Sequence, residues 1–504
     1  MRTIQSWSRW ASLAFPLLGT VACGVESSSA GDAGSGGSSA GTSGASASGG
    51  GAATGAVGTA WFEIIEPFPA DLEPGTDPAT ITHETTPIAA SEDGSALVGA
   101  SWFLSMRGST QFGANGFHWT RATGAVDLGY PGPAPETPIY ISPERVSRDA
   151  SVVVGRAITS FGTPVFHWSQ SAGMVDIGNF EGSAPQIELD DLSADGSVIA
   201  GTLNQLAFRW TAETGIESLG VLPGRKTSDM VAVSGDGRVI FGASSDDSVR
   251  TLFRWTAANG MEALADGCQV APGGVNDDGS KVVGMCSVDG GVAGYQWSEA
   301  RGVQSLGLPP SGYDILRYFP KPEQGVLVAQ GRGPNREDYQ ALRATEQSGF
   351  VALGALPDNP SCFALGRELS GLELDRTPMN ADGSVVAGTC MNTAGGTQLG
   401  FRWSERSGLV AMRPLAGHVR TLVTSVSSDG IVAGTSSDGA SETEGVLWDA
   451  NGEPRSIRVL LEGAGVALDG FSLDEVVVIR GGRLLYGAGR NAAGAGRTWV
   501  ALLP

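Results

Sequence analysis

The stretch A-V-S-G-D-G-R-V-I-F-G-A-S at residues 232–244, followed by L-F-R-W-T-A-A-N-G-M-E-A-L at residues 252–264, decides the fold. It predicts a strand that ends at the serine, a tight Asp-Gly turn, and a second strand that ends in a glycine. A third strand carries Phe253 and Trp255, whose spacing of two puts both rings on one face. Gly260 suits the left-handed position of a second turn, and a short fourth strand follows.

This unit recurs to the end of the chain, with most neighbouring tryptophans 42 to 51 residues apart. The tryptophans of the series are Trp119, Trp168, Trp210, Trp255, Trp297, Trp403, Trp448 and Trp499. A degenerate copy near residues 313–357 has Ala344 at the tryptophan position. Since the aromatic residues share one face of each third strand, we expect them in the core rather than on a glycan-stacking platform.

Four-stranded units of this length predict an all-β fold, a β-propeller of eight or nine blades. The number depends on whether the degenerate copy is a full blade. The segment W-F-E-I-I-E-P at residues 61–67 is expected to supply the fourth strand of the last blade and so to close the ring. An open β-solenoid is the alternative. No window after residue 60 has a convincing helical period.

Composition narrows the functional classes. The chain has 504 residues, 75 of them glycine, and a formal net charge of -21. So much glycine argues against a mostly helical protein. The negative charge argues against a nucleic-acid partner, because a phosphate backbone is bound by basic surfaces. We expect a monomer with a sizeable core.

The N-terminus has the pattern of an export signal. Two arginines precede an uncharged, mostly apolar stretch at residues 10–22, which is too short to span a bilayer. The sequence T-V-A-C up to Cys23 resembles the bacterial lipoprotein signal, in which the cysteine is lipidated, although Thr20 stands where leucine is usual. The alternative is an ordinary signal that is cleaved near Ala22 and leaves the cysteine unmodified.

These features predict three segments: a lipoprotein signal peptide at 1–22, a flexible tether rich in Gly, Ser and Ala at 23–59, and a repeat domain at 60–504. The lipid anchor would be the only membrane contact. The residue after Cys23 is Gly24 and not an aspartate, and in this the sequence resembles lipoproteins that are sent to the outer membrane. We therefore expect an outer-membrane lipoprotein of the cell envelope, periplasmic or surface-exposed.

The repeat resembles the extracellular HAF-repeat family. The family element H-A-F-x-W is approximated at four places, which are residues 116–119, 165–168, 207–210 and 400–403. The leading histidine is absent from every copy, so no role for it is transferred. The resemblance covers roughly residues 85–500 and implies an exported repetitive β protein, without implying a reaction or a ligand.

Four cysteines lie in the repeat domain, at equivalent positions of two copies. Four cysteines allow three pairings, and the repeat argument selects Cys268–Cys286 and Cys362–Cys390. Such bridges suit an oxidising compartment. Buried free thiols are the alternative. Metal binding is disfavoured, because there is no C-x-x-C spacing.

Residues that carry chemistry are scarce, and we assign no catalytic residue, no cofactor and no metal. His118 and His167 occupy a polar position of the third strand where other copies have arginine or glutamine, which indicates a tolerant polar site. The G-x-S-x-G match at residues 37–41 lies in low-complexity sequence. The acidic run at residues 276–280 is expected to form a turn rather than a calcium site. The glycine-rich run at residues 487–494 is expected to be a loop between strands.

Two functional hypotheses follow. The first is a non-enzymatic binding or scaffold module at the envelope, with an unidentified protein or polysaccharide ligand held by the long connections at residues 103–116 and 358–378. The alternative is an exported polysaccharide hydrolase or lyase with acids in the propeller funnel. Facing carboxylates with aromatic neighbours would favour the enzyme.

Overall fold

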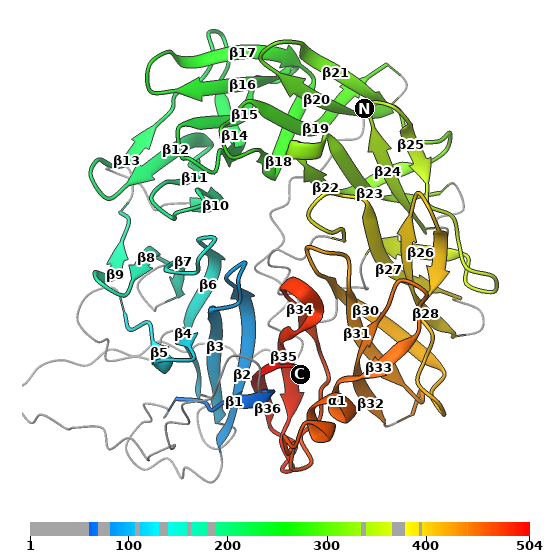
Figure 1. The fold of residues 1–504 in the computed structure, drawn as a ribbon. Helices are drawn as coiled ribbons and strands as arrows, with labels where there is room; N and C mark the ends of the chain where they lie inside the picture. Colours follow the sequence, from blue (N-terminus) through cyan, green and yellow to red (C-terminus); the bar gives the residue numbers. More distant parts are fainter. Residues whose placement is uncertain are drawn as a thin grey trace, which may run out of the picture. The chain divides into compact units, whose positions relative to one another are not determined.

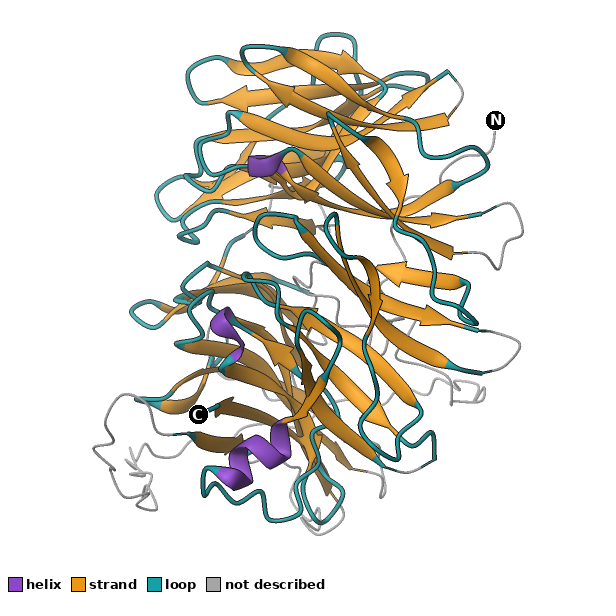
Figure 2. Ribbon diagram, turned by 45° about the vertical axis from the view of Figure 1, so that its right-hand side comes forward, coloured by secondary structure: helices purple, strands orange, loops and turns teal. Residues whose placement is uncertain are grey.

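The computed structural model describes residues 60–68, 81–105, 111–130, 140–158, 163–178, 187–289, 291–333, 339–364, 378–392, 396–440 and 442–504. Strands make up most of this part of the chain (Figure 2). The signal peptide, Cys23, the tether and the G-x-S-x-G match lie outside the described residues.

The described strands form nine groups of four, which we number in chain order (Figure 1). Pairing within each group is antiparallel and follows the chain, except that β1 joins the end of group nine. A single parallel bridge between Ala114 and Tyr140 joins the first group to the second. The groups are: one, β2 (Ile81–Ala90), β3 (Ala96–Ser105), β4 (Gln111–Thr120) and β5 (Gly124–Asp127); two, β6 (Tyr140–Val146), β7 (Val152–Ile158), β8 (Val165–Ser169) and β9 (Gly173–Asp176); three, β10 (Ile187–Leu192), β11 (Ile199–Leu203), β12 (Leu206–Thr211) and β13 (Gly215–Ser218); four, β14 (Thr227–Val233), β15 (Val239–Ser245), β16 (Arg250–Thr256) and β17 (Gly260–Asp266); five, β18 (Cys268–Val275), β19 (Lys281–Val288), β20 (Gly291–Ser298) and β21 (Gly302–Gly307); six, β22 (Asp314–Lys321), β23 (Val326–Arg332), β24 (Tyr339–Thr345) and β25 (Gly349–Ala352); seven, β26 (Ser361–Ala364), β27 (Val385–Met391), β28 (Gln398–Ser404) and β29 (Gly408–Ala411); eight, β30 (Arg420–Val426), β31 (Val432–Ser437), β32 (Thr443–Trp448) and β33 (Pro454–Ser456); nine, β34 (Val477–Val478), β35 (Leu484–Arg490), β36 (Gly496–Leu502) and β1 (Trp61–Ile65).

The ninth group combines the two ends of the repeat domain. Strand β1 pairs antiparallel with β36, from Trp61 opposite Leu502 to Ile65 opposite Thr498. Figure 1 shows the blue β1 beside the red β36. The predicted contribution of an N-terminal strand to the last group is therefore confirmed. The degenerate copy forms the complete sixth group, β22 to β25.

Both predicted turns have the expected backbone. The glycine five residues after the tryptophan position is left-handed in all seven copies that carry it, with φ between 63° and 69°. In the Asp-Gly turn of group four, Ser234 Oγ donates to Asp236 Oδ1 at 2.6 Å and accepts from Val239 N at 3.0 Å. Group two has Ala150 in place of the glycine, and this alanine adopts φ 53°. The turn therefore dictates the conformation even where the residue disfavours it.

The third-strand aromatic residues lie in the core, as predicted. Trp119, Trp168, Trp448 and Trp499 are all buried. Each packs among the aliphatic residues of the neighbouring strands and groups. The sequence periodicity thus identified the core face of the third strand.

A glycine in the apolar second strand of most copies is needed for a different reason from the turn glycines, because the first strand bulges toward it. A Cβ built at Gly201 would lie 2.2 Å from the carbonyl oxygen of Glu188, and one at Gly434 would lie 1.9 Å from that of Leu422. The register shifts one or two residues further along both first strands. Only glycine leaves room for this close approach of two backbones.

Neighbouring groups contact one another in a repeated way. The turn glycine of one group packs on the first residue of the second strand of the preceding group, as Gly196 does on Val152 and Gly279 does on Val239. The same contact joins group nine to group one, where the Cβ position of Gly94 meets Leu484.

Two expectations about irregular segments are corrected. The helix α1 (Ile457–Gly463) follows β33, and Ser456 caps it by accepting from Val459 N. Seven residues hold too few turns for a helical period to stand out. Much of residues 103–116 is not an irregular connection, because β3 and β4 pair from Ser105 opposite Gln111 onward. Of residues 358–378, the first part forms β26, and 365–377 lie outside the described residues.

Candidate functional site

The first strands of groups two and three carry ionisable residues where other copies have apolar or small ones. The fifth and fourth residues before the turn aspartate are Ile88-Ala89 in group one and Val231-Ala232 in group four. Groups two and three instead have Glu144-Arg145 and Asp190-Asp191. The register of both strands shifts at this point, so the bulge presents these side chains. We call Glu144, Arg145, Glu188 and Asp190 the first-strand cluster.

Asp190 is the central residue of this cluster. Its Oδ2 accepts from Thr202 Oγ1 at 3.1 Å and from Val231 N of the next group at 3.3 Å. The pKa of the Asp190 carboxyl is raised to about 7, chiefly by burial and to a smaller extent by the negative charge of Glu188. The two hydrogen bonds and the charge of Arg145 oppose this rise. A carboxyl with this pKa is populated in both protonation states near neutral pH.

Two arginines tie this part of group two to group three. Arg156 Nε lies 3.5 Å from Glu144 Oε1, and Arg156 Nη2 donates to Ile187 O at 3.0 Å. Arg145 Nη2 donates to Asp190 O at 3.4 Å. Burial raises the pKa of Glu144, although both arginines oppose the effect. The cluster therefore combines two carboxyls of raised pKa with fixed positive charge.

Group four continues this polar region with a strained residue. Met230 has φ 52°, which a side chain of its size rarely adopts, and it immediately precedes the N–H that Asp190 accepts. Arg250 donates from Nη2 to Asp229 and from Nη1 to Met230 Sδ at 3.2 Å. Burial raises the pKa of Asp229, and Arg250 opposes it.

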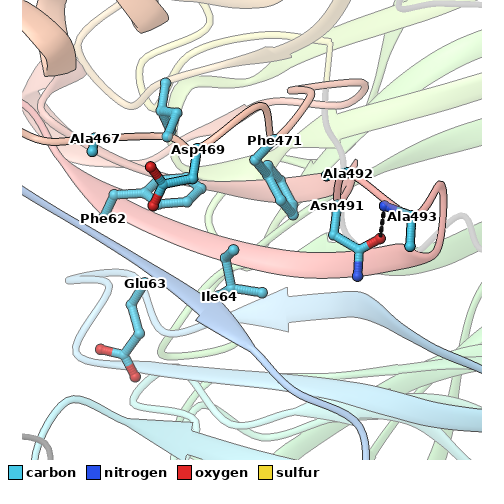
Figure 3. A pocket seen from close by; sticks show the side chains of 10 residues that line it. Phe62, Glu63, Ile64, Ala467, Asp469, Phe471, Asn491, Ala492 and Ala493 are labelled. Atoms are coloured by element: carbon cyan, nitrogen blue, oxygen red, sulfur yellow. Dashed lines mark hydrogen bonds between the residues drawn. The ribbon is translucent and has the colours of Figure 1, made fainter.

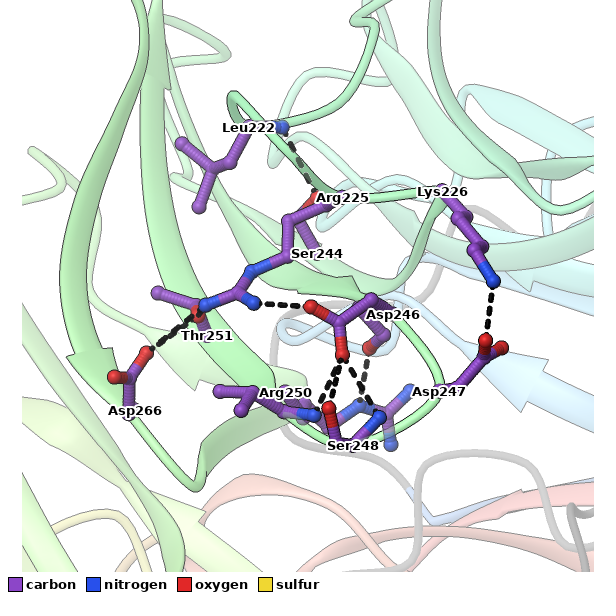
Figure 4. Close-up of polar contacts among 12 residues, drawn as sticks. Leu222, Arg225, Lys226, Ser244, Asp246, Asp247, Ser248, Arg250, Thr251 and Asp266 are labelled. Atoms are coloured by element: carbon purple, nitrogen blue, oxygen red, sulfur yellow. Dashed lines mark hydrogen bonds and ion pairs between the residues drawn. The ribbon is translucent and has the colours of Figure 1, made fainter.

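A second polar network in group four is saturated with internal contacts (Figure 4). Arg225 pairs with Asp246 and donates from Nη2 to Thr251 Oγ1 at 2.8 Å. Asp246 Oδ1 also accepts from the N–H groups of Ser248 and Val249, and these bonds hold the pKa of its carboxyl well below the usual range. The charged groups of this network therefore hold the loops of group four together.

The acidic run at residues 276–280 forms a turn, as predicted. Asn276 Nδ2 donates to Asp278 Oδ1 at 2.8 Å, and both Asp277 oxygens accept from Arg148 of group two, at 3.1 Å and 2.5 Å. The described ranges contain no group of three or more His, Cys, Asp or Glu side chains placed to bind a metal ion. The run at residues 487–494 forms the end of β35 and the turn after it.

The tolerant polar position of the third strand proves to link neighbouring groups. The ring of His118 packs on Trp168 at 5.2 Å between centroids, and His167 packs on Trp210 at 4.9 Å. At the same position Arg343 donates to Gly383 O of the next group at 3.1 Å. Burial lowers the pKa of both histidines. The position therefore has a structural role that several polar residues can fill.

Both predicted disulfides are present, Cys268–Cys286 and Cys362–Cys390. Each joins the first strand of its group to the second, between residues directly opposite in the register. Disulfides persist in oxidising compartments, so they indicate an exported protein. Within the described part of the chain, no helix is both long and apolar enough to span a membrane.

The first-strand cluster was missed in the sequence analysis, which named no catalytic residue. The available signal was the replacement of an apolar or small pair by Glu144-Arg145 and Asp190-Asp191 at one repeat position. Comparison of the copies position by position would have revealed it. The hydrogen bond that Asp190 accepts from Val231 N comes from the next group, so no single strand sequence contains this contact.

No family model matches the chain, and a comparison with curated proteins finds no match. Among solved structures, an oligogalacturonate lyase from Vibrio parahaemolyticus is 10% identical, with a TM-score of 0.41, over 84% of this chain and 98% of that chain. An oligogalacturonate lyase in complex with manganese is 12% identical, with a TM-score of 0.41, over 84% and 96%. Dipeptidyl peptidase 4 from Porphyromonas gingivalis is 12% identical, with a TM-score of 0.43, over 82% and 57%.

These comparisons correct the first functional hypothesis. A non-enzymatic binding or scaffold module was expected, but the three solved structures named above, two oligogalacturonate lyases and a dipeptidyl peptidase 4, are enzymes. At such low identity the likeness concerns the fold alone. It transfers no substrate, metal or active-site residue to this chain.

Proposed function

We propose that this chain is an exported enzyme that cleaves polysaccharide, with Asp190 as its acid–base group. The observation that carries the proposal is the partly buried Asp190 carboxyl, whose pKa is raised to about 7 beside Glu188 and Arg145. Strongly perturbed carboxyls with a specific charged neighbour are concentrated at functional sites.

The chemistry of glycosidic bonds explains why such a group is useful. A glycosidic oxygen leaves readily only when it receives a proton, and the donor must still be protonated at the working pH. In a hydrolase, protonated Asp190 supplies this proton as the C–O bond breaks, and a water molecule adds to the anomeric carbon and releases a proton to the solvent. In a lyase, the ionised form of the same group takes a proton from a sugar carbon, a C=C bond forms in the ring, and the glycosidic oxygen on the adjacent carbon leaves. Arg145 holds the backbone of Asp190 and limits the rise of its pKa.

The test is cleavage of a panel of neutral and acidic polysaccharides at pH 7, followed through new reducing ends and through the ultraviolet absorbance of unsaturated products. Asp190→Asn keeps an oxygen that accepts from Thr202 and Val231 but removes proton transfer. We expect it to lower the cleavage rate 100-fold or more, by roughly the contribution of general acid–base catalysis. The proposal is wrong if no polysaccharide is cleaved, or if Asp190→Asn cleaves at the wild-type rate.

The matched control is Asp176→Asn, at the end of β9. This exposed carboxylate also accepts a backbone hydrogen bond, from Gly178 N at 2.9 Å. It should leave the cleavage rate unchanged. Equal melting temperatures of the two variants would separate a chemical role of Asp190 from a structural one.

We also infer that the nine groups close into a nine-bladed β-propeller. Three contacts support closure: β1 completes the ninth group, Gly94 meets Leu484 as other turn glycines meet the preceding group, and Thr498 N donates to Thr85 Oγ1 of group one at 2.7 Å. An open solenoid would leave the outer faces of groups one and nine without such contacts. Small-angle scattering distinguishes the two, since a solenoid is much more elongated.

The location of the protein at the outer membrane is a further proposal, and it rests on the sequence. Lipidation at Cys23 would hold the enzyme at the outer membrane, and the repeat resembles the HAF-repeat family. Cys23→Ala should abolish labelling by a radioactive fatty acid and release the protein from the membrane fraction. Retention of both in the variant would contradict the lipoprotein proposal.

A further inference from the structure

An open pocket of about 710 Å³ lies far along the chain from Asp190, in the ninth group (Figure 3). One side is strand β1, a second is the loop at residues 467–471 after α1, and the third is the turn between β35 and β36. A volume of this size is typical of small-molecule sites.

The floor of the pocket is aromatic. The partly exposed ring of Phe62 stacks on the buried Trp499 at 5.9 Å between centroids and meets the edge of the buried Phe471 at 5.5 Å. Figure 3 shows Phe62, Ile64 and Phe471 on one side of β1. These contacts fix the ring, so a flat apolar surface is available without reorganisation.

The rim carries planar polar side chains. Asp469 is exposed and adopts φ 47° in a turn closed by the bond from Phe471 N to Leu468 O at 2.8 Å. Asn491 Oδ1 accepts from Ala493 N at 3.1 Å and from Ala495 N at 3.0 Å. These bonds orient the Asn491 amide, and its Nδ2 is the end that the turn does not use.

The charge of the pocket restricts its ligand. Of the described residues that line it, none is a lysine, arginine or histidine, and two are the carboxylates Glu63 and Asp469. Glu63 points to the other side of β1 in Figure 3, where it accepts from Trp119 Nε1 at 2.9 Å. An anionic ligand therefore meets only negative charge and is disfavoured.

We propose that this pocket binds a neutral pyranose unit of a polysaccharide. The C–H face of the sugar lies on Phe62, and its hydroxyl groups bond to the Asp469 carboxylate and the Asn491 amide. The inference deepens the proposed function, since it gives the enzyme a second contact with its polymer, away from the first-strand cluster.

The experiment measures binding by titration calorimetry on the full protein, with four probes: cellohexaose and maltohexaose as neutral sugars, hexagalacturonate as an acidic one, and a chitosan hexamer as a cationic one. Ala493→Trp places a large side chain at the exposed rim of the pocket. Ala258→Trp makes the same change at an exposed turn of group four and is the matched control. Asp190→Asn completes the set.

We expect at least one neutral hexamer to bind, Ala493→Trp to weaken that binding at least tenfold, and Ala258→Trp to leave it unchanged. No binding of either neutral hexamer, binding only of a charged hexamer, or unchanged binding in Ala493→Trp would overturn the inference. Loss of cleavage in Asp190→Asn is read separately, so failure of the pocket and failure of the proposed function are distinguishable.

Discussion

The bulged first strand makes a sharp prediction for Gly201→Ala. A methyl group at this position would lie 2.2 Å from Glu188 O and 2.7 Å from a ring carbon of Phe208. Both distances are more than half an ångström below an ordinary contact, and the nearer atom belongs to the backbone, so it cannot rotate away. Overpacking of a well-packed site costs roughly 1–3 kcal/mol, and this site should lie near about 3 kcal/mol.

Gly215→Ala is the informative comparison, because it changes the same residue type in the same group for a different reason. Gly215 has φ 69° and nothing within 4 Å of its Cβ position. Only the backbone strain of a left-handed alanine applies, which costs about 1 kcal/mol. Urea denaturation of both variants should therefore give free energies of unfolding that differ by about 2 kcal/mol. Equal losses, or a smaller loss for Gly201→Ala, would refute the argument that this glycine is required by a close backbone approach.

Three further predictions follow from local contacts. Replacing both cysteines of either disulfide by alanine should lower the free energy of unfolding by about 3 to 4 kcal/mol, since the sequence separations are 18 and 28 residues; unchanged urea midpoints would contradict it. Burial lowers the pKa of His167 in the folded state, so the unfolded chain binds a proton more readily and stability falls as the pH drops from about 6.5 through the lower folded pKa. His167→Gln should therefore lose less stability than wild type between pH 7 and pH 5, as measured by melting temperature. Ser456→Ala removes the side chain that caps α1 and should cost about 1 kcal/mol in urea denaturation, whereas no loss would show that the cap contributes nothing.

The strand plan of the repeat could be predicted because each strand and turn depends on residues close in sequence. Gly260 and the Asp236-Gly237 turn are both left-handed where the pattern required it. The disulfide pairing was predictable for the same reason, since equivalent cysteines in two copies must occupy equivalent places in two sheets.

The site could not be predicted in this way, because its properties arise between groups. Asp190 accepts hydrogen bonds from Val231 of the next group and from Arg145 of the preceding group, 45 residues away. The role of His118 likewise depends on Trp168, in the next repeat. Contacts of this kind become visible only when the sheets are placed side by side.

The most direct test of the central claim is the pH dependence of polysaccharide cleavage by wild type and by Asp190→Asn. Because burial raises the pKa of Asp190 to about 7, the wild-type rate should change by an order of magnitude over the two pH units around that value. The residual rate of Asp190→Asn should be flat across this range. A wild-type profile without a transition near pH 7, or the same transition in Asp190→Asn, would contradict the assignment of Asp190 as the acid–base group.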